Sequence, residues 1–166
     1  MQGCFIGHRT IKKTEALVSL LKETVEALID KGVTAFLFGS MSEFDELSWE
    51  VVTKLKEKYP FIKRIYVRSG YPRIDKAYEE YLFELYEETY FPTSLENAGK
   101  YVYVERNYEM IDNSTYCVFY YNENYTPPLK QRFKYNSSMP LRRTSGTKIA
   151  YEYAVKKKKT IINLYK

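Results

Sequence analysis

His8 is the only histidine of the chain, and it stands between Gly7 and Arg9 directly after a short apolar run, "CFI" at 4–6. An imidazole titrates near neutral pH and can transfer protons, whereas a guanidinium pairs with phosphate or carboxylate groups. No serine or cysteine nucleophile with a partnered triad can be assembled around His8 from the sequence. The segment therefore suits either a ligand contact or acid–base catalysis, and both interpretations stay open.

Three carboxylates are further candidates for catalysis: Asp45, Asp112 and Glu152. The "SEFD" segment at 42–45 has the spacing of a capping box, so Asp45 could instead accept the backbone N–H of Ser42. Glu152 is more typical of a solvated helix position than of a catalytic carboxylate. Because the chain has one histidine and two cysteines set in apolar runs, we expect neither a metal site nor a cofactor.

Small residues that could hold phosphate occur at Gly39-Ser40 and at Ser145-Gly146-Thr147. Glycine lets the backbone approach a ligand closely, and a helix N-terminus offers N–H groups to an anion. Ser145 and Thr147 could equally cap the helix that follows them. The sequence contains neither GxxxxGK[ST] nor GxGxxG, so its phosphate contacts would differ from those of a P-loop or a dinucleotide fingerprint.

The spacing of apolar residues predicts alternating strands and helices. Strands are predicted at 4–6, 33–39, 61–68, 115–121 and 160–165, with at most a short one at 89–91, and helices at about 14–32, 47–55, 75–88, 106–114 and 149–154. This order is typical of an α/β, three-layer Rossmann-like domain over residues 1–166, with a mostly parallel sheet of about five strands and helices on both faces.

Ligands of such sheets bind beyond the carboxyl ends of the strands. Gly7-His8-Arg9, Gly39-Ser40 and Arg68-Ser69-Gly70 follow the first three predicted strands, and Arg106-Asn107 begins the helix before the fourth. The candidate residues therefore fall where a binding site is expected.

The formal net charge of +5 favours an anionic partner, although part of the excess lies in local runs such as "KKKK" at 156–159. The stretch 122–146 is predicted to be a long loop. In it, basic residues alternate with aromatic ones, as in contacts to single-stranded nucleic acid: Lys130, Arg132, Lys134, Arg142 and Arg143 with Tyr125, Phe133 and Tyr135. A solvated basic lid is the alternative. The 18 tyrosines are otherwise interpreted as packing residues.

Cys4 and Cys117 lie within apolar runs and are interpreted as buried free thiols of a reducing compartment. No apolar stretch reaches the roughly 18 residues that a membrane span needs, and the N-terminus lacks the features of a secretory signal. We therefore expect a cytoplasmic protein without a membrane partner, and a homo-oligomer stays open.

Four ordered segments resemble the SLOG superfamily, the Rossmann-like domains related to the DNA-processing protein DprA and the LOG phosphoribohydrolases. They are "CFIGHR" at 4–9, "FLFGSMSEFD" at 36–45, "RNYEMIDNS" at 106–114 and "SGTKIAYEYAVKKKKTIIN" at 145–163. The chain looks closest to a bacterial and phage branch with a C-F-x-G-H-R strand end. The resemblance implies a nucleotide pocket formed by Gly7, His8, Arg9, Gly39, Ser40, Arg106, Asn107, Gly146 and Thr147.

The resemblance also implies three activities, because members sense nucleotide signals, bind single-stranded DNA or cleave N-glycosidic bonds. The phosphoribohydrolases carry "PGGxGTxxE", whereas "SGT" here lacks the double glycine and Glu152 falls two positions later. Ser40 stands where many relatives have a double glycine. We therefore expect binding of a nucleotide-derived ligand, as in a sensor, ahead of a nucleotide N-glycosidase, with single-stranded nucleic-acid binding third.

These hypotheses assign different roles to the same residues. In a binding protein, Arg9 and Arg106 would pair with phosphate, and the turn at 145–147 would donate backbone N–H groups. Asn107 or Asp112 would contact ribose or base. In a hydrolase, one of the three candidate carboxylates would stabilise an oxocarbenium-like transition state, and His8 would assist the leaving base.

Overall fold

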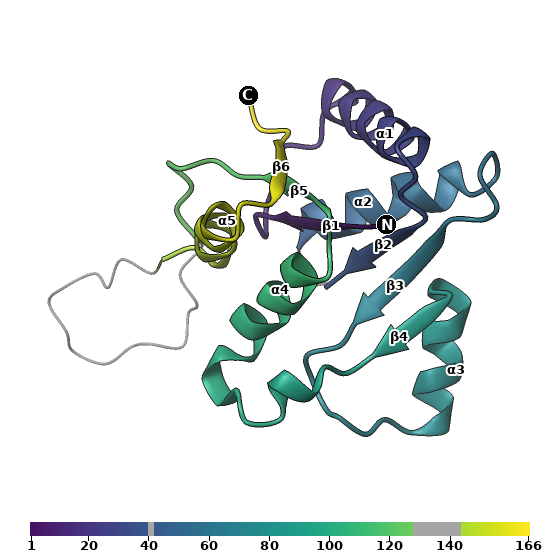
Figure 1. The fold of residues 1–166 in the computed structure, drawn as a ribbon, viewed down its shortest axis with the longest axis vertical. Helices are drawn as coiled ribbons and strands as arrows, with labels where there is room; N and C mark the ends of the chain where they lie inside the picture. The colour runs from purple at the N-terminus through teal and green to yellow at the C-terminus, as the bar shows by residue number, and fades with distance from the viewer. Residues whose placement is uncertain (40–41, 128–143) are drawn as a thin grey trace, which may run out of the picture.

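One parallel sheet forms the centre of the molecule (Figure 1). The computed structural model describes residues 1–39, 42–127 and 144–166. Over these residues the strands are β1 (Gln2–Gly7), β2 (Ala35–Phe38), β3 (Lys63–Val67), β4 (Glu88–Tyr90), β5 (Tyr116–Tyr120) and β6 (Thr160–Asn163), in the spatial order β4-β3-β2-β1-β5-β6. The sheet has six strands rather than about five, because the short segment at 88–90 pairs with β3.

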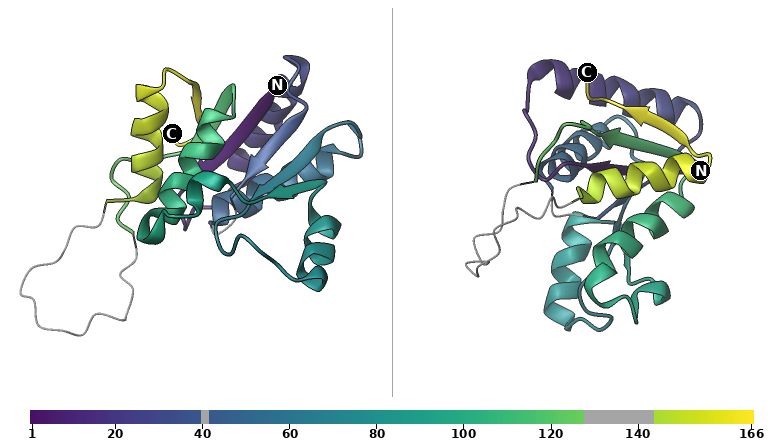
Figure 2. Two further views of the ribbon diagram at one scale, coloured as in Figure 1. Left: turned by 60° about the horizontal axis from the view of Figure 1, so that its bottom comes forward. Right: turned by 90° about the vertical axis from the view of Figure 1, so that its left-hand side faces the viewer.

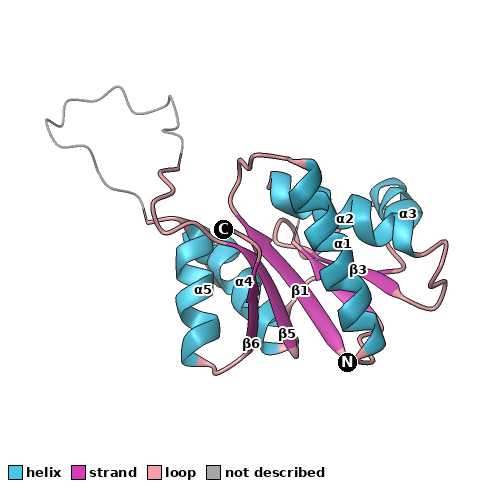
Figure 3. Cartoon of the chain, turned by 90° about the horizontal axis from the view of Figure 1, so that it is seen from above, coloured by secondary structure: helices cyan, strands magenta, loops and turns pink. Residues whose placement is uncertain are grey.

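Helices cover both faces of the sheet, which confirms the predicted three-layer α/β fold (Figure 3). They are α1 (Glu15–Asp30), α2 (Glu43–Leu55), α3 (Lys76–Leu85), α4 (Val102–Asp112) and α5 (Gly146–Lys156). The helices α1, α2 and α3 pack on one face, and α4 and α5 lie side by side on the other (Figure 2). Successive side chains of β1 point to opposite faces of the sheet. Phe5 packs in the core under α1, α2 and α3, whereas Cys4 and Ile6 pack in the core under α4 and α5.

Side-chain caps explain where the first three helices begin. Thr14, Ser42 and Asp75 each accept the backbone N–H three residues later, at 3.1, 3.0 and 2.8 Å. Gly32, with a φ of 92°, follows the end of α1, where a left-handed residue closes a helix at little cost. The predicted start of α4 was late, because the helix already begins at Val102, after a 3-10 turn at Gly99–Tyr101.

The order of the strands reverses at β1, since the chain runs outward through β2, β3 and β4 on one side and then returns to β5 on the other. Open α/β sheets bind ligands in the crevice at such a reversal, beyond the carboxyl ends of the strands. Cys4 and Cys117 are directly opposite each other in β1 and β5, and both are buried free thiols. The basic residues at 130, 132, 134, 142 and 143 lie outside the described residues.

Candidate functional site

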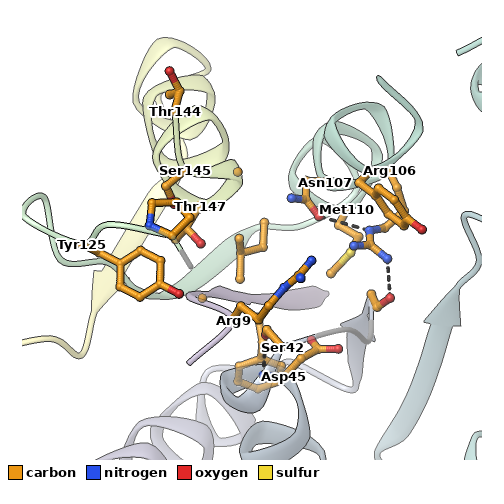
Figure 4. A pocket seen from close by; sticks show the side chains of 17 residues that line it. Arg9, Ser42, Asp45, Arg106, Asn107, Met110, Tyr125, Thr144, Ser145 and Thr147 are labelled. Carbon is orange, nitrogen blue, oxygen red and sulfur yellow. Dashed lines mark hydrogen bonds between the residues drawn. The ribbon is translucent and has the colours of Figure 1, made fainter. Parts of the chain in front are cut away.

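A cavity of about 270 Å³ lies at the carboxyl ends of β1, β2 and β5, where the strand order reverses (Figure 4). Most residues predicted for the site line it: Gly7, Arg9, Gly39, Asp45, Arg106, Asn107, Ser145, Gly146 and Thr147. They come from segments far apart in the sequence, which the parallel sheet brings to one edge. Ser40, also predicted, lies outside the described residues.

Arg106 forms a buried wall of the cavity. It projects from α4 and is only 5% exposed. Its guanidinium donates one hydrogen bond to the carbonyl oxygen of Gly39 and another to Asn107 Oδ1, at 3.1 Å. Burial lowers the pKa of this guanidinium, and the nearby Asp45 carboxylate counteracts that effect. Arginine stays charged in proteins, so Arg106 supplies fixed positive charge at the wall.

Two glycines of the site are required by packing. A Cβ on Gly39 would lie 2.5 Å from Cζ of Arg106, so a side chain there would collide with the guanidinium. A Cβ on Gly7 would lie 2.4 Å from the ring of Phe44, at the start of α2. Both glycines let neighbouring side chains approach the strand ends, which accounts for their positions without a ligand.

Asp45 is the carboxylate that lines the cavity among the described residues, and it is 6% exposed. It lies in the first turn of α2, where its backbone N–H is donated to Ser42 Oγ, so Ser42 is the cap of that helix. Its negative charge acts on Arg106 across the cavity. The buried guanidinium and the buried carboxylate thus compensate each other's charge.

Arg9 and the N-terminus of α5 face the same cavity from opposite sides (Figure 4). Arg9 is exposed, and among the described residues its guanidinium has no hydrogen-bond or ion-pair partner. Ser145 is the N-cap residue of α5, but its side chain makes no capping hydrogen bond, unlike the caps of α1, α2 and α3. Among the described residues no side chain caps these first N–H groups of α5, which could therefore bind an anion in the cavity.

The model of the YspA SLOG family matches residues 6–154, nearly the whole described domain. The chain belongs to the YspA SLOG family. No curated protein matches it. Apart from Phe5, every residue that lines the cavity lies within the match, so the site belongs to the SLOG domain itself.

His8 of this SLOG domain lies behind the cavity wall. It is 1% exposed, and its ring stacks on Tyr125 with centroids 3.8 Å apart. Its Nε2 lies 2.8 Å from the backbone nitrogen and 3.1 Å from the backbone oxygen of Asn122, and its Nδ1 lies 3.4 Å from Ser145 Oγ. Burial lowers the pKa of the imidazole, an effect that the nearby Asn122 carbonyl oxygen opposes. His8 thus joins both described ends of the long loop to the end of β1.

Two of the predicted carboxylates are placed away from the SLOG cavity. Asp112 is the last residue of α4, so it lies near the start of β5 and not at its carboxyl end. It accepts the Tyr153 hydroxyl at 2.8 Å and pairs with Lys157 at 3.3 Å. Glu152 is exposed on α5 and pairs with Lys148 at 3.8 Å.

Several residues that line the SLOG cavity were not predicted from the sequence. Tyr103 and Met110 line it together with Arg106, one helical stripe of α4. Their spacing would have indicated that stripe had the start of α4 been predicted correctly. Tyr125 was noted only as a loop aromatic, and its position over His8 depends on contacts 114 or more residues apart in sequence.

Two features are absent from the described residues. No helix in these parts is both long and apolar enough to cross a bilayer. No group of three or more histidine, cysteine, aspartate or glutamate side chains in the described ranges could hold a metal ion.

Proposed function

We propose that this SLOG domain binds a nucleotide-derived ligand in the cavity of about 270 Å³ described above, which we call the first cavity. A phosphate group of the ligand would lie between Arg9 and the N-terminus of α5. The observation that carries the proposal is the uncapped start of α5 facing an arginine that has no partner among the described residues. Backbone N–H groups, a helix dipole and a guanidinium together favour a phosphate. Family membership supports a nucleotide-related ligand.

Arg9 and Arg106 have different tasks in this proposal. Arg106 already uses Nη1 and Nε for Gly39 and Asn107, so it chiefly holds the wall and adds positive charge. Arg9 is exposed and can turn both of its terminal nitrogens toward a phosphate in a bidentate pair. Arg9 is therefore the principal phosphate ligand.

The base of the nucleotide is assigned to Tyr125. This ring lines the cavity while one of its faces rests on His8, with the planes inclined by only 16°. Its hydroxyl lies 3.4 Å from Thr10 Oγ1, a second contact that restrains the ring. A restrained aromatic surface can stack on a base with little loss of side-chain entropy.

The second candidate is hydrolysis of a nucleotide N-glycosidic bond, and the buried Asp45 in the cavity favours it. A carboxylate there could stabilise an oxocarbenium-like transition state. Glycoside hydrolysis ordinarily uses two carboxylates, and Asp45 is the acidic residue that lines the cavity among the described ones. Binding without cleavage is therefore proposed first.

The test of binding is a thermal-shift panel of nucleoside phosphates, cyclic nucleotides and ADP-ribose derivatives on the intact chain. At least one compound should raise the unfolding temperature. Arg9→Gln should lower the binding affinity for that compound by roughly tenfold or more, as expected for a lost charge-assisted hydrogen bond. Lys22→Gln removes one charge from the exposed face of α1 and should leave binding unchanged. A panel without any shift would refute the proposal.

The two candidates differ in the fate of the ligand. We expect the compound that binds to remain intact after long incubation, as followed by chromatography of the released base. Base release that Asp45→Asn abolishes would instead establish the hydrolase. Asparagine keeps the size of the side chain and removes the negative charge, so the variant tests the carboxylate chemistry directly.

A further inference from the structure

A second cavity of about 450 Å³ opens beside the carboxyl end of β3. It contains the Arg68-Gly70 strand end, which the first cavity does not use, and the two cavities have no lining residue in common. Tyr66 of β3 forms one wall. Arg73 of the following loop and Tyr78 of α3 form others.

Arg68 is held in place at this cavity. Its Nη1 donates to the carbonyl oxygens of Tyr71 at 3.1 Å and Pro72 at 3.4 Å, so the guanidinium is fixed by its own loop. Its Nε is buried and finds no acceptor among the described residues. A ligand oxygen cannot reach a buried Nε, whereas Nη2 is neither buried nor hydrogen-bonded within the described residues, so Nη2 can donate to an anion in the cavity.

The charge of the second cavity is positive. Arg68 and Arg73 both line it, and no ion pair of the described residues includes either of them. Asp75 is the acidic residue of the lining, and it accepts the Tyr78 backbone N–H at 2.8 Å as the cap of α3. Two guanidinium groups against one carboxylate favour an anion.

Aromatic rings surround these charges. Tyr71 is 81% exposed and Tyr78 is 42% exposed, although both line the cavity. Such rings on a charged cavity offer stacking surfaces for a planar group. The volume also lies within the range of roughly 300–1,000 Å³ found for small-molecule sites.

We propose that the second cavity is a separate binding site for a phosphate monoester that carries an aromatic ring, of the size of a mononucleotide. The phosphate oxygens accept hydrogen bonds from Nη2 of Arg68 and from the guanidinium of Arg73. The ring of the ligand stacks on Tyr71. This assignment does not depend on what the first cavity binds.

The two sites are neighbours along the sheet edge. Tyr66 lines the second cavity, and its hydroxyl lies within electrostatic reach of Arg106 and Asp45 of the first. The background for a test is therefore the Arg9→Gln variant, which weakens phosphate binding in the first cavity and leaves these buried residues unchanged.

The experiment is calorimetric titration of the Arg9→Gln chain with adenosine monophosphate, with inorganic phosphate and adenosine as separate arms. Adenosine monophosphate should bind at one site, and both separate arms should bind at least tenfold more weakly. Adding Arg68→Met should lower the affinity for adenosine monophosphate tenfold or more. Arg68→Lys in its place should lower that affinity less. Equal affinity with and without Arg68→Met would overturn the proposal.

Tyr71→Ala gives a second measurement on a side chain that is too exposed to matter for folding. It should lower the affinity for adenosine monophosphate severalfold and leave the affinity for inorganic phosphate unchanged. If both probes keep their affinities, the ring contact is wrong. A different result would contradict the first-cavity proposal: the Arg9→Gln chain would bind every nucleotide with the same affinity as the unmodified chain.

Discussion

The guanidinium of Arg106 donates a hydrogen bond to the carbonyl oxygen of Gly39, 67 residues earlier in the chain. This contact joins α4 to the end of β2 and closes one wall of the first cavity. It depends on the absence of a side chain at position 39. One wall of the cavity is therefore built by a buried arginine that binds protein backbone, and Arg9 is the arginine that we propose as the ligand contact.

Gly39→Ala is expected to destabilise the fold and to weaken ligand binding together. The added Cβ would lie 2.5 Å from Arg106 Cζ, so the guanidinium must shift away from its acceptor. Overpacking of this kind costs about 1–3 kcal/mol of unfolding free energy, measurable by chemical denaturation. Gly3→Ala is the control, since its Cβ would meet Phe36 at an ordinary 3.5 Å. Equal losses in the two variants would contradict the steric argument.

The pH dependence of stability should contain a contribution from His8. Burial lowers the pKa of its imidazole below 6.5, so the folded chain favours the neutral ring. The stabilisation is complete above pH 6.5 and is lost as the pH falls through the folded pKa, because the unfolded chain binds the proton more readily. As the only histidine, His8 can be isolated by comparing denaturation of the unmodified chain and His8→Gln from pH 8 to 5. Parallel curves would refute this account.

Glu87 should stabilise the chain in acid more than an ordinary surface glutamate does. Burial alone would raise its pKa, but hydrogen bonds from the side chain and backbone of Arg64 overcome this effect and hold the pKa at about 2. Its contribution is present above pH 4.5 and is lost as the pH falls through 2. Glu87→Gln should cost about 1–2 kcal/mol near neutral pH, measured by urea unfolding.

The control for Glu87 is its neighbour Glu88, whose carboxylate pairs with Lys63 at the surface, where both side chains are about half exposed. Exposed ion pairs contribute little, so Glu88→Gln should change stability by less than about 0.5 kcal/mol. A larger effect of Glu88→Gln than of Glu87→Gln would show that the buried Arg64 contact is not the stabilising one.

Tyr125 should affect only ligands that contain a base. In the proposed arrangement its ring stacks on the base, whereas Arg9 and α5 bind the phosphate. Tyr125→Leu should weaken a nucleoside monophosphate by about 1–3 kcal/mol, the usual value of a stacked base, and leave ribose 5-phosphate unchanged in titration calorimetry. Tyr125→Phe keeps the ring and should retain the affinity. If Tyr125→Leu instead lowers the affinity for both the nucleoside monophosphate and ribose 5-phosphate, the substitution has collapsed the loop.

The arrangement of strands and helices was predictable because buried strands and amphipathic helices have different apolar periods. The parallel order then placed Gly7, Gly39 and the turn at 145–147 at one edge, as the structure confirms. The short β4 was doubtful because three residues show no clear period. The SLOG membership expected from the ordered segments is confirmed by the family match over residues 6–154.

Individual roles were harder to predict, since they depend on contacts between distant segments. His8 and Arg9 are adjacent in sequence, yet His8 is buried against the Asn122 backbone and Arg9 remains exposed. Asp112 is the last residue of the helix that contains Arg106, so the same helix takes one residue to the cavity and the other to the opposite end of the sheet. Local sequence contains neither fact.

The first cavity is formed by segments from both sides of β1 in the sheet. Gly39 belongs to the β2 side, whereas α4, Tyr125 and the start of α5 belong to the β5 side. Local opening that separates the two sides would therefore abolish the cavity, whereas fraying at either outer strand would leave it intact. A bound ligand would stabilise only the joined state, so it would slow amide exchange on both sides of β1 at once.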